Sequence, residues 1–143
     1  MKKLVVSLVA VGLILTPLFS LASDRADRLL VILTSENSVT QLMSLVLANQ
    51  ALGKGVQVDL LLCGGAGNLA IEGAEEVKLK PKDVSPQMLM KKLISSGSRV
   101  EICPPYLPNA GKTPEDLVSG IGVANPTEVA DRLLDEDTKI LSY

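Results

Sequence analysis

Two cysteines, Cys63 and Cys103, are the residues of this sequence with the most distinctive chemistry. Each ends an aliphatic run and precedes residues that break regular structure, Gly64 and Gly65 after the first cysteine and two prolines after the second. A cysteine can act as a nucleophile when part of it is present as the thiolate. The alternative interpretation is structural, because a free cysteine often packs as a small buried hydrophobic residue.

The absence of histidine removes several kinds of chemistry, since the chain contains none. A Ser-His-Asp triad, a Cys-His nucleophile pair and any zinc site with histidine ligands cannot be built, and two cysteines are too few for a four-cysteine zinc site. We therefore expect no metal, no cofactor and no hydrolase activity. Thiol chemistry at Cys63 or Cys103, carboxylate chemistry and simple binding remain.

The first 22 residues are predicted to be a secretory signal peptide. Two lysines precede an apolar run over residues 4–15, and Ser20-Leu21-Ala22 forms a small-x-small cleavage site. We expect cleavage after Ala22, a periplasmic or secreted location, and no membrane attachment once the signal is removed. An uncleaved membrane anchor is the competing interpretation.

Residues 23–143 are then expected to form one domain. This mature chain has 12 basic and 16 acidic residues, a net charge of −4. Its one basic cluster consists of Lys78, Lys80 and Lys82, and no aromatic residue interleaves it for base stacking. We therefore expect no nucleic-acid partner and interpret the cluster as a solvated turn.

Aliphatic runs alternate with helical patterns along the mature chain. Strands are predicted over residues 28–35, 56–65, 99–103 and 139–143, with a weaker edge strand over residues 77–80. Helix starts are predicted at Ser38, with Gln41 completing a capping box, and at Ser85, Thr113 and Asn125, each followed by proline, with Glu128 completing the last cap. This alternation predicts a three-layer α/β/α sandwich with a mostly parallel sheet of about five strands.

Both cysteines are placed by this order at the carboxyl ends of buried strands. In open α/β sheets, ligands and reacting groups gather at that edge. Cys103 is the stronger candidate for a catalytic thiol, because the two prolines after it carry no amide hydrogen and hold the following loop open. Cys63 is expected to be a buried small residue, or at most an accessory thiol.

A glycine-rich stretch follows Cys63 and offers a second candidate site. Residues 65–70, GAGNLA, match the relaxed dinucleotide-binding pattern G-x-G-x-x-A between a strand and a short helix. Gly64, Gly65 and Gly67 are thus a candidate ligand-binding loop. The pattern follows the second strand rather than the first, and Asp83 is the distant candidate for a ribose-binding acid, so a plain tight turn is the competing interpretation.

The mature sequence resembles the DsrE/DsrF-like family. The resemblance rests on the opening LLVILTS, the step ANQALGKGVQVDLLLCGGAG, the cysteine strand VEICPPYLPNAG and the closing KILSY. In the sulfur-relay members, a cysteine at the end of the third strand carries sulfur as a persulfide, and the resemblance places Cys103 there. It also implies a homo-oligomer or pairing with a related subunit, and a sulfur-donor protein as partner. A helix amino terminus, Lys112 or a neighbouring subunit is expected to supply any positive charge that lowers the thiol pKa.

Three classes of function are therefore expected, in this order. The first is an exported, thiol-based sulfur carrier that uses Cys103, which would be at most a carrier or transferase component. The second is a non-catalytic binding or assembly module on the same fold. The third is a binder of a nucleotide-type ligand through Gly65 to Ala70.

A disulfide between the two cysteines is not expected. Neighbouring strands lie about 4.8 Å apart, so if the first strand lies between the two cysteine strands, their ends are about 9.6 Å apart. A disulfide tolerates a Cα separation of no more than about 7 Å. This strand order predicts two unpaired thiols.

Overall fold

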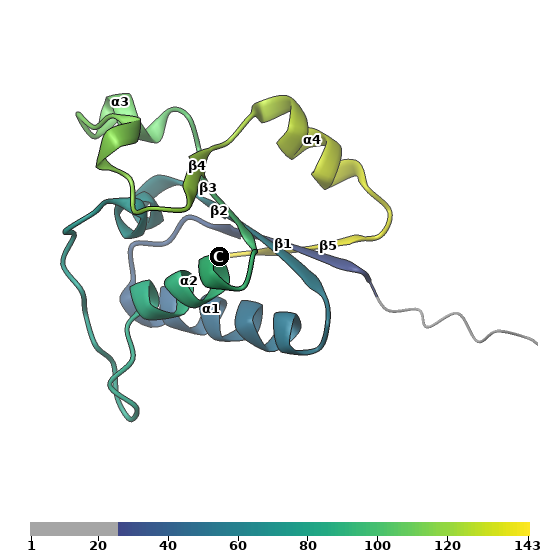
Figure 1. Ribbon diagram of the computed structural model, residues 1–143, viewed down its shortest axis with the longest axis horizontal. Coiled ribbons are helices and arrows are strands. Elements are labelled where there is room, and N and C mark those ends of the chain that lie inside the picture. Colours follow the sequence, from purple (N-terminus) through teal and green to yellow (C-terminus); the bar gives the residue numbers. More distant parts are fainter. Residues whose placement is uncertain (1–25) are drawn as a thin grey trace, which may run out of the picture.

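The computed structural model describes residues 26–143, which form one sheet covered by helices (Figure 1). The predicted signal peptide over residues 1–22 lies outside the described residues. The strands are β1 (Arg28–Leu33), β2 (Gln57–Leu62), β3 (Arg99–Ile102), β4 (Ile121–Val123) and β5 (Thr138–Ser142). They pair in the order β4-β3-β2-β1-β5, and every neighbouring pair is parallel.

Helices cover both faces of this sheet, so the predicted three-layer α/β/α sandwich is confirmed. Figure 1 shows α1 (Ser38–Gly53) and α2 (Pro86–Ser95) on one face and α4 (Pro126–Leu134) on the other. Shorter segments follow the strands: the 3-10 helices η1 (Gly64–Ala70) and η2 (Pro114–Asp116), and the single helical turn α3 (Tyr106–Asn109). No helix within residues 26–143 combines the length and the hydrophobicity needed to cross a membrane.

The two faces of the sheet differ in what they bury. Beneath α1 and α2 lies the main aliphatic core, to which β2 contributes Val58, Leu60 and Leu62. The alternate residues of β2 face α4, and there Leu61 joins a much smaller cluster. A strand covered on both faces needs apolar side chains on both, which explains the near-continuous hydrophobic run of β2.

The start of α1 shows a different cap from the predicted one. The side-chain oxygen of Asn37 accepts hydrogen bonds from the backbone amides of Val39 (3.1 Å) and Thr40 (3.0 Å). The side chain of Gln41 instead donates to the carbonyl of Ser35 at 2.9 Å. The predicted Ser38–Gln41 capping box is therefore wrong, because Asn37, one residue earlier, has the extended backbone that a capping residue requires.

The proline-marked helix starts are confirmed in two cases. The Ser85 hydroxyl accepts from the amide of Met88 at 3.1 Å, and the Asn125 side chain accepts from Thr127 at 2.9 Å. Glu128 does not complete the second cap, because its carboxylate pairs with Arg99 at 3.0 Å. Thr113 begins only the short turn η2, where it forms a capping box with Asp116.

The fifth strand is β4, whereas the sequence favoured residues 77–80. In that segment, Leu79 forms only an isolated bridge with Val84. β4 is three residues long and pairs with β3 through Val100 and Ile102. A strand this short, with glycine at its centre, has too few residues to show a periodic pattern.

Candidate functional site

Cys63 and Cys103 lie at the carboxyl edge of the sheet, each one residue beyond its strand. The amide of Cys63 donates to the carbonyl of Leu33 on β1, and the amide of Cys103 donates to the carbonyl of Leu62 on β2, both at 2.9 Å. These bonds continue the parallel ladder past the strand ends. Both cysteines are thereby fixed at the backbone rather than carried on a free loop.

The two cysteines are neighbours, which corrects the predicted geometry. β2 pairs directly with β3, Leu62 is the register partner of Ile102, and the cysteines are the next residues on each strand. Adjacent strands lie about 4.8 Å apart, within the Cα separation that a disulfide accepts. The predicted separation of about 9.6 Å is wrong because β1 lies on the far side of β2 from β3.

Both side chains lie on the α4 side of the sheet as free thiols. They pack against the small cluster formed by Leu30, Leu61 and Ala124. Burial, followed by interaction with Cys103, raises the pKa of Cys63 from 9.0 to about 12. Cys63 is therefore held as a protonated thiol over the whole physiological pH range.

Cys103 lines two apolar cavities. We call the first the tyrosine pocket: it has a volume of about 380 Å³ and is lined by Gly64, Cys103, Pro105, Tyr106, Asn109 and Ala110. The second, the α4 pocket, has a volume of about 220 Å³ and includes Leu61, Pro104, Val129 and Leu133 beside Cys103. Cys63 lines neither of them. Both thiols are partly exposed, and Cys103 is the one that lines these two cavities.

The segment after Cys103 turns into a helix rather than staying an open loop. The amide of Tyr106 donates to the carbonyl of Cys103 at 3.1 Å, and α3 follows. Pro104 and Pro105 form the turn. Neither residue has a backbone N–H, so neither can donate a backbone hydrogen bond to the sulfur of Cys103. Burial raises the pKa of the Tyr106 phenol, whose ring lies in the wall of the tyrosine pocket.

The glycines of the predicted ligand loop are engaged in packing. A Cβ on Gly67 would lie 2.3 Å from the Tyr106 ring, and a Cβ on Gly65 would lie 2.6 Å from the Cβ of Glu36. Gly64 has a φ of 51°, a left-handed conformation that glycine adopts without strain. The space beside Gly67 is therefore filled by the Tyr106 ring, and the space beside Gly65 is filled by Glu36.

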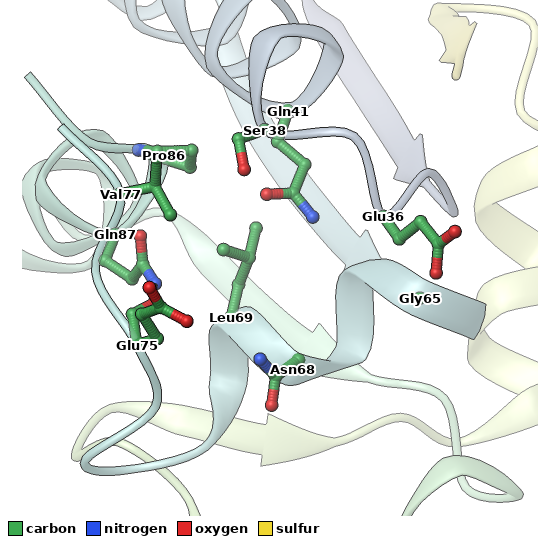
Figure 2. Close-up of a pocket in the computed structure, with 10 residues that line it drawn as sticks. All are labelled: Glu36, Ser38, Gln41, Gly65, Asn68, Leu69, Glu75, Val77, Pro86 and Gln87. Atoms are coloured by element: carbon green, nitrogen blue, oxygen red, sulfur yellow. The ribbon is translucent and has the colours of Figure 1, made fainter. Parts of the chain in front are cut away.

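A separate pocket of about 300 Å³ lies beside η1 (Figure 2). Figure 2 shows Leu69 between Gln41 and Gln87, with Glu36 and Glu75 toward opposite sides of the view. Its lining contains these two carboxylates and neither lysine nor arginine. A phosphate group would meet negative charge here without a compensating cation, so this pocket offers no support for a nucleotide-type ligand.

The predicted role of Lys112 finds no support in its contacts. Its amine lies 4.0 Å from the carboxylate of Asp116, four residues later in the chain. Neither the tyrosine pocket nor the α4 pocket has a charged side chain in its lining. The surroundings of Cys103 are therefore apolar, and Lys112 is paired elsewhere.

A buried ion-pair network lies on the same face of the sheet, and sequence reasoning missed it. Arg132 of α4 donates to Glu101 at 2.6 Å and to Asp59 at 3.3 Å, and the side chains of Arg132 and Asp59 are only 8% and 3% exposed. Burial disfavours the charged form of Arg132 and by itself lowers its pKa. The interactions with Glu101 and then with Asp59 are together stronger, so the pKa of Arg132 is raised. A carboxylate inside the run VQVDLLLC signals such a partner, because a buried charge must be paired.

The described residues hold no cluster of three or more histidine, cysteine, aspartate or glutamate side chains that could bind a metal ion. The reactive groups of the site are two adjacent thiols. One of them faces apolar cavities and the other is kept protonated.

Comparison with known proteins relates the chain to others by its structure. No protein-family model and no curated protein matches the sequence. The structure is similar to the crystal structure of YchN from E. coli, with a TM-score of 0.69 and 18% identity, covering 82% of this chain and 99% of YchN. It is also similar to MTH1491, a protein of unknown function from Methanobacterium thermoautotrophicum, with a TM-score of 0.63 and 14% identity, covering 81% of this chain and 98% of that one. The chain thus has the DsrE-type fold of these proteins, as its sequence resemblance predicts.

Proposed function

We propose that this protein, which has the DsrE-type fold, is a sulfur carrier that holds sulfur as a persulfide on Cys103. The observation that carries the proposal is the position of Cys103. It lies at the carboxyl edge of a parallel sheet and lines two apolar cavities, while Cys63 lines neither. The sequence resemblance assigns the sulfur-carrying role to the same residue.

The loading step is an exchange between sulfur atoms. The Cys103 thiolate attacks the outer sulfur of a donor persulfide, forms a new S–S bond, and breaks the S–S bond of the donor, which leaves as a thiolate. No net oxidation occurs, so no further reactant is needed. The persulfide then lies against the apolar walls of the tyrosine pocket.

The proposal extends to location and assembly. We propose that the protein is exported by its signal peptide and acts outside the cytoplasm, where its sulfur donor would be another exported protein. We also propose that copies associate, because large apolar side chains are exposed on and beside α4. Leu134 is 82% exposed, Ile140 on the edge strand β5 is 49% exposed, and Leu133 is 38% exposed. A non-catalytic assembly module on this fold is the second candidate, favoured by the same exposed residues.

The test of the carrier function is to map where sulfur is added. The reduced protein is incubated with inorganic polysulfide, freed of excess reagent, and analysed by intact-mass and peptide mass spectrometry. We expect the mass of one sulfur atom on the Cys103 peptide in Cys63→Ser, and none in Cys103→Ser. Sulfur that persists in Cys103→Ser but vanishes in Cys63→Ser would move the site to the other strand. No loading of any variant would favour the assembly module.

A further inference from the structure

The two thiols form a pair built into the sheet. Cys63 and Cys103 directly follow the register partners Leu62 and Ile102, and both side chains pack into the same cluster on the α4 side. We propose that Cys63 is the resolving thiol of the site: it attacks the persulfide on Cys103, releases sulfide, and leaves a Cys63–Cys103 disulfide. This inference rests on the proposed function, because it requires that Cys103 be the residue that holds the sulfur.

The backbone places the two cysteines within the Cα separation that a disulfide accepts. The ladder hydrogen bonds at Cys63 and Cys103, both 2.9 Å, fix the two residues on adjacent parallel strands. The strand spacing of about 4.8 Å falls within the Cα range of about 4.4–6.8 Å found for disulfides. Both side chains lie on one face of the sheet, beside the same apolar cluster, so neither strand has to turn over for the sulfur atoms to meet.

The step balances without any further reactant. The Cys63 thiol first gives its proton to water, the resulting thiolate attacks Sγ of Cys103, and the bond from that atom to the outer sulfur breaks. The outer sulfur leaves as HS⁻, having gained the two electrons that the two cysteines lose when they form the disulfide. A second turnover requires a dithiol reductant, which reduces the disulfide through a mixed disulfide with one of the two cysteines.

The environment of Cys63 makes this release slower than loading. Only a thiolate attacks a disulfide or persulfide bond, and burial keeps Cys63 protonated, with a pKa of about 12. Cys63 also lies outside both cavities that Cys103 lines, so a donor that enters either cavity contacts Cys103. The persulfide therefore has time to pass to an acceptor protein before the second thiol converts it to sulfide.

The experiment compares how long the sulfur is held. Wild type and Cys63→Ser are loaded with inorganic polysulfide, freed of excess, and followed by sulfide release and by mass. We expect wild type to release one sulfide per chain and to gain a Cys63–Cys103 cross-linked peptide in the monomer. We expect Cys63→Ser to hold its sulfur at least tenfold longer. The release rate in wild type should be independent of protein concentration, because the attack is intramolecular.

Other outcomes separate this inference from the proposed function. If wild type and Cys63→Ser hold sulfur equally long, Cys63 is not the resolving thiol, while the carrier function stands. If the sulfur moves to the Cys63 peptide and no sulfide is released, the resolving role of Cys63 is also overturned. Cys63 would then have attacked the outer sulfur of the persulfide instead of Sγ of Cys103. If Cys103 does not load in Cys63→Ser, both proposals fail.

A second measurement tests the pairing without any sulfur donor. Treatment of the reduced protein with diamide should remove both thiols and give one disulfide within each chain, with no covalent link between chains. Two thiols that remain titratable, or only cross-linked dimers, would show that the pair cannot close.

Discussion

The ring of Tyr106 occupies the space above Gly67 where a side chain would otherwise lie. A Cβ built on Gly67 would be 2.3 Å from ring atom Cδ2 of Tyr106, closer than any real contact. This joins the loop after Cys63 to the helical turn after Cys103, since Gly67 belongs to η1 and Tyr106 to α3. The glycine therefore positions the ring that lines the tyrosine pocket.

Gly67→Ala is expected to displace this ring and to destabilise the protein by about 1–3 kcal/mol, the usual cost of adding a methyl group to a well-packed site. Gly53→Ala is the matched control, because Gly53 ends α1 and has nothing within 4 Å of an added Cβ. The control should change stability by less than about 1 kcal/mol, in the stabilising direction. Urea unfolding measures both, and an equal effect of the two substitutions would contradict the packing role of Gly67.

Arg132→Met is expected to cost about 3–5 kcal/mol of stability, because it leaves the buried Asp59 and the partly buried Glu101 without a cation. Arg99→Met is the control, since the Arg99–Glu128 pair has side chains that are 49% and 56% exposed. Its cost should not exceed about 1 kcal/mol. Unfolding midpoints in urea distinguish the two, and similar midpoints would mean that α4 does not depend on the buried pair.

The Cys63 thiol is expected to make stability fall at high pH. Its pKa is about 12 in the folded protein against an ordinary 9.0, so the unfolded chain loses this proton first as pH rises. The contribution of Cys63 is therefore complete below pH 9.0 and is lost progressively toward about pH 12. Cys63→Ser should show a shallower decline than wild type over this range, because serine does not titrate there. If the stability of wild type and of Cys63→Ser falls equally over this pH range, the pKa of Cys63 in the folded protein lies near its ordinary value.

Leu134→Glu is expected to weaken self-association, because it places a charge among the exposed apolar side chains at the end of α4. Size-exclusion chromatography with light scattering should give a mass above that of the monomer for wild type and a smaller mass for the variant. Lys91→Glu, an exposed position on α2 across the sheet, serves as the control and should leave the mass unchanged. A monomeric wild type would contradict the proposed assembly.

Export predicts that the mature protein begins at Ser23, directly after the small-x-small site. Amino-terminal sequencing of protein recovered from the periplasm or the medium checks the cleavage position. Protein that begins at Met1 and remains in the membrane fraction would support the anchor instead.

Much of the fold follows from local patterns in the sequence. The aliphatic runs of β1 and β2 predict strands, because strands buried on both faces must be apolar throughout, and the shorter runs at residues 99–103 and 139–143 correspond to β3 and β5. The starts of α2 and α4 were predicted because Ser85 and Asn125 combine a capping side chain with a following proline. Each of these features is contained in a few consecutive residues.

The candidate site depends on information that no short stretch contains. The sequence placed Cys63 and Cys103 at strand ends, but their adjacency follows from the pairing of β2 with β3. The same holds for β4, whose three residues become a strand only through pairing with β3.

The sequence by itself determined the type and position of most elements, the aliphatic core, and the two thiols at the carboxyl edge of the sheet. The tertiary structure decided the strand order, and with it the distance between the thiols, the cavities beside Cys103 and the partners of Arg132. The physical reason is that burial and capping act within one element, whereas the order of parallel strands depends on how the helical connections pack across the whole sheet.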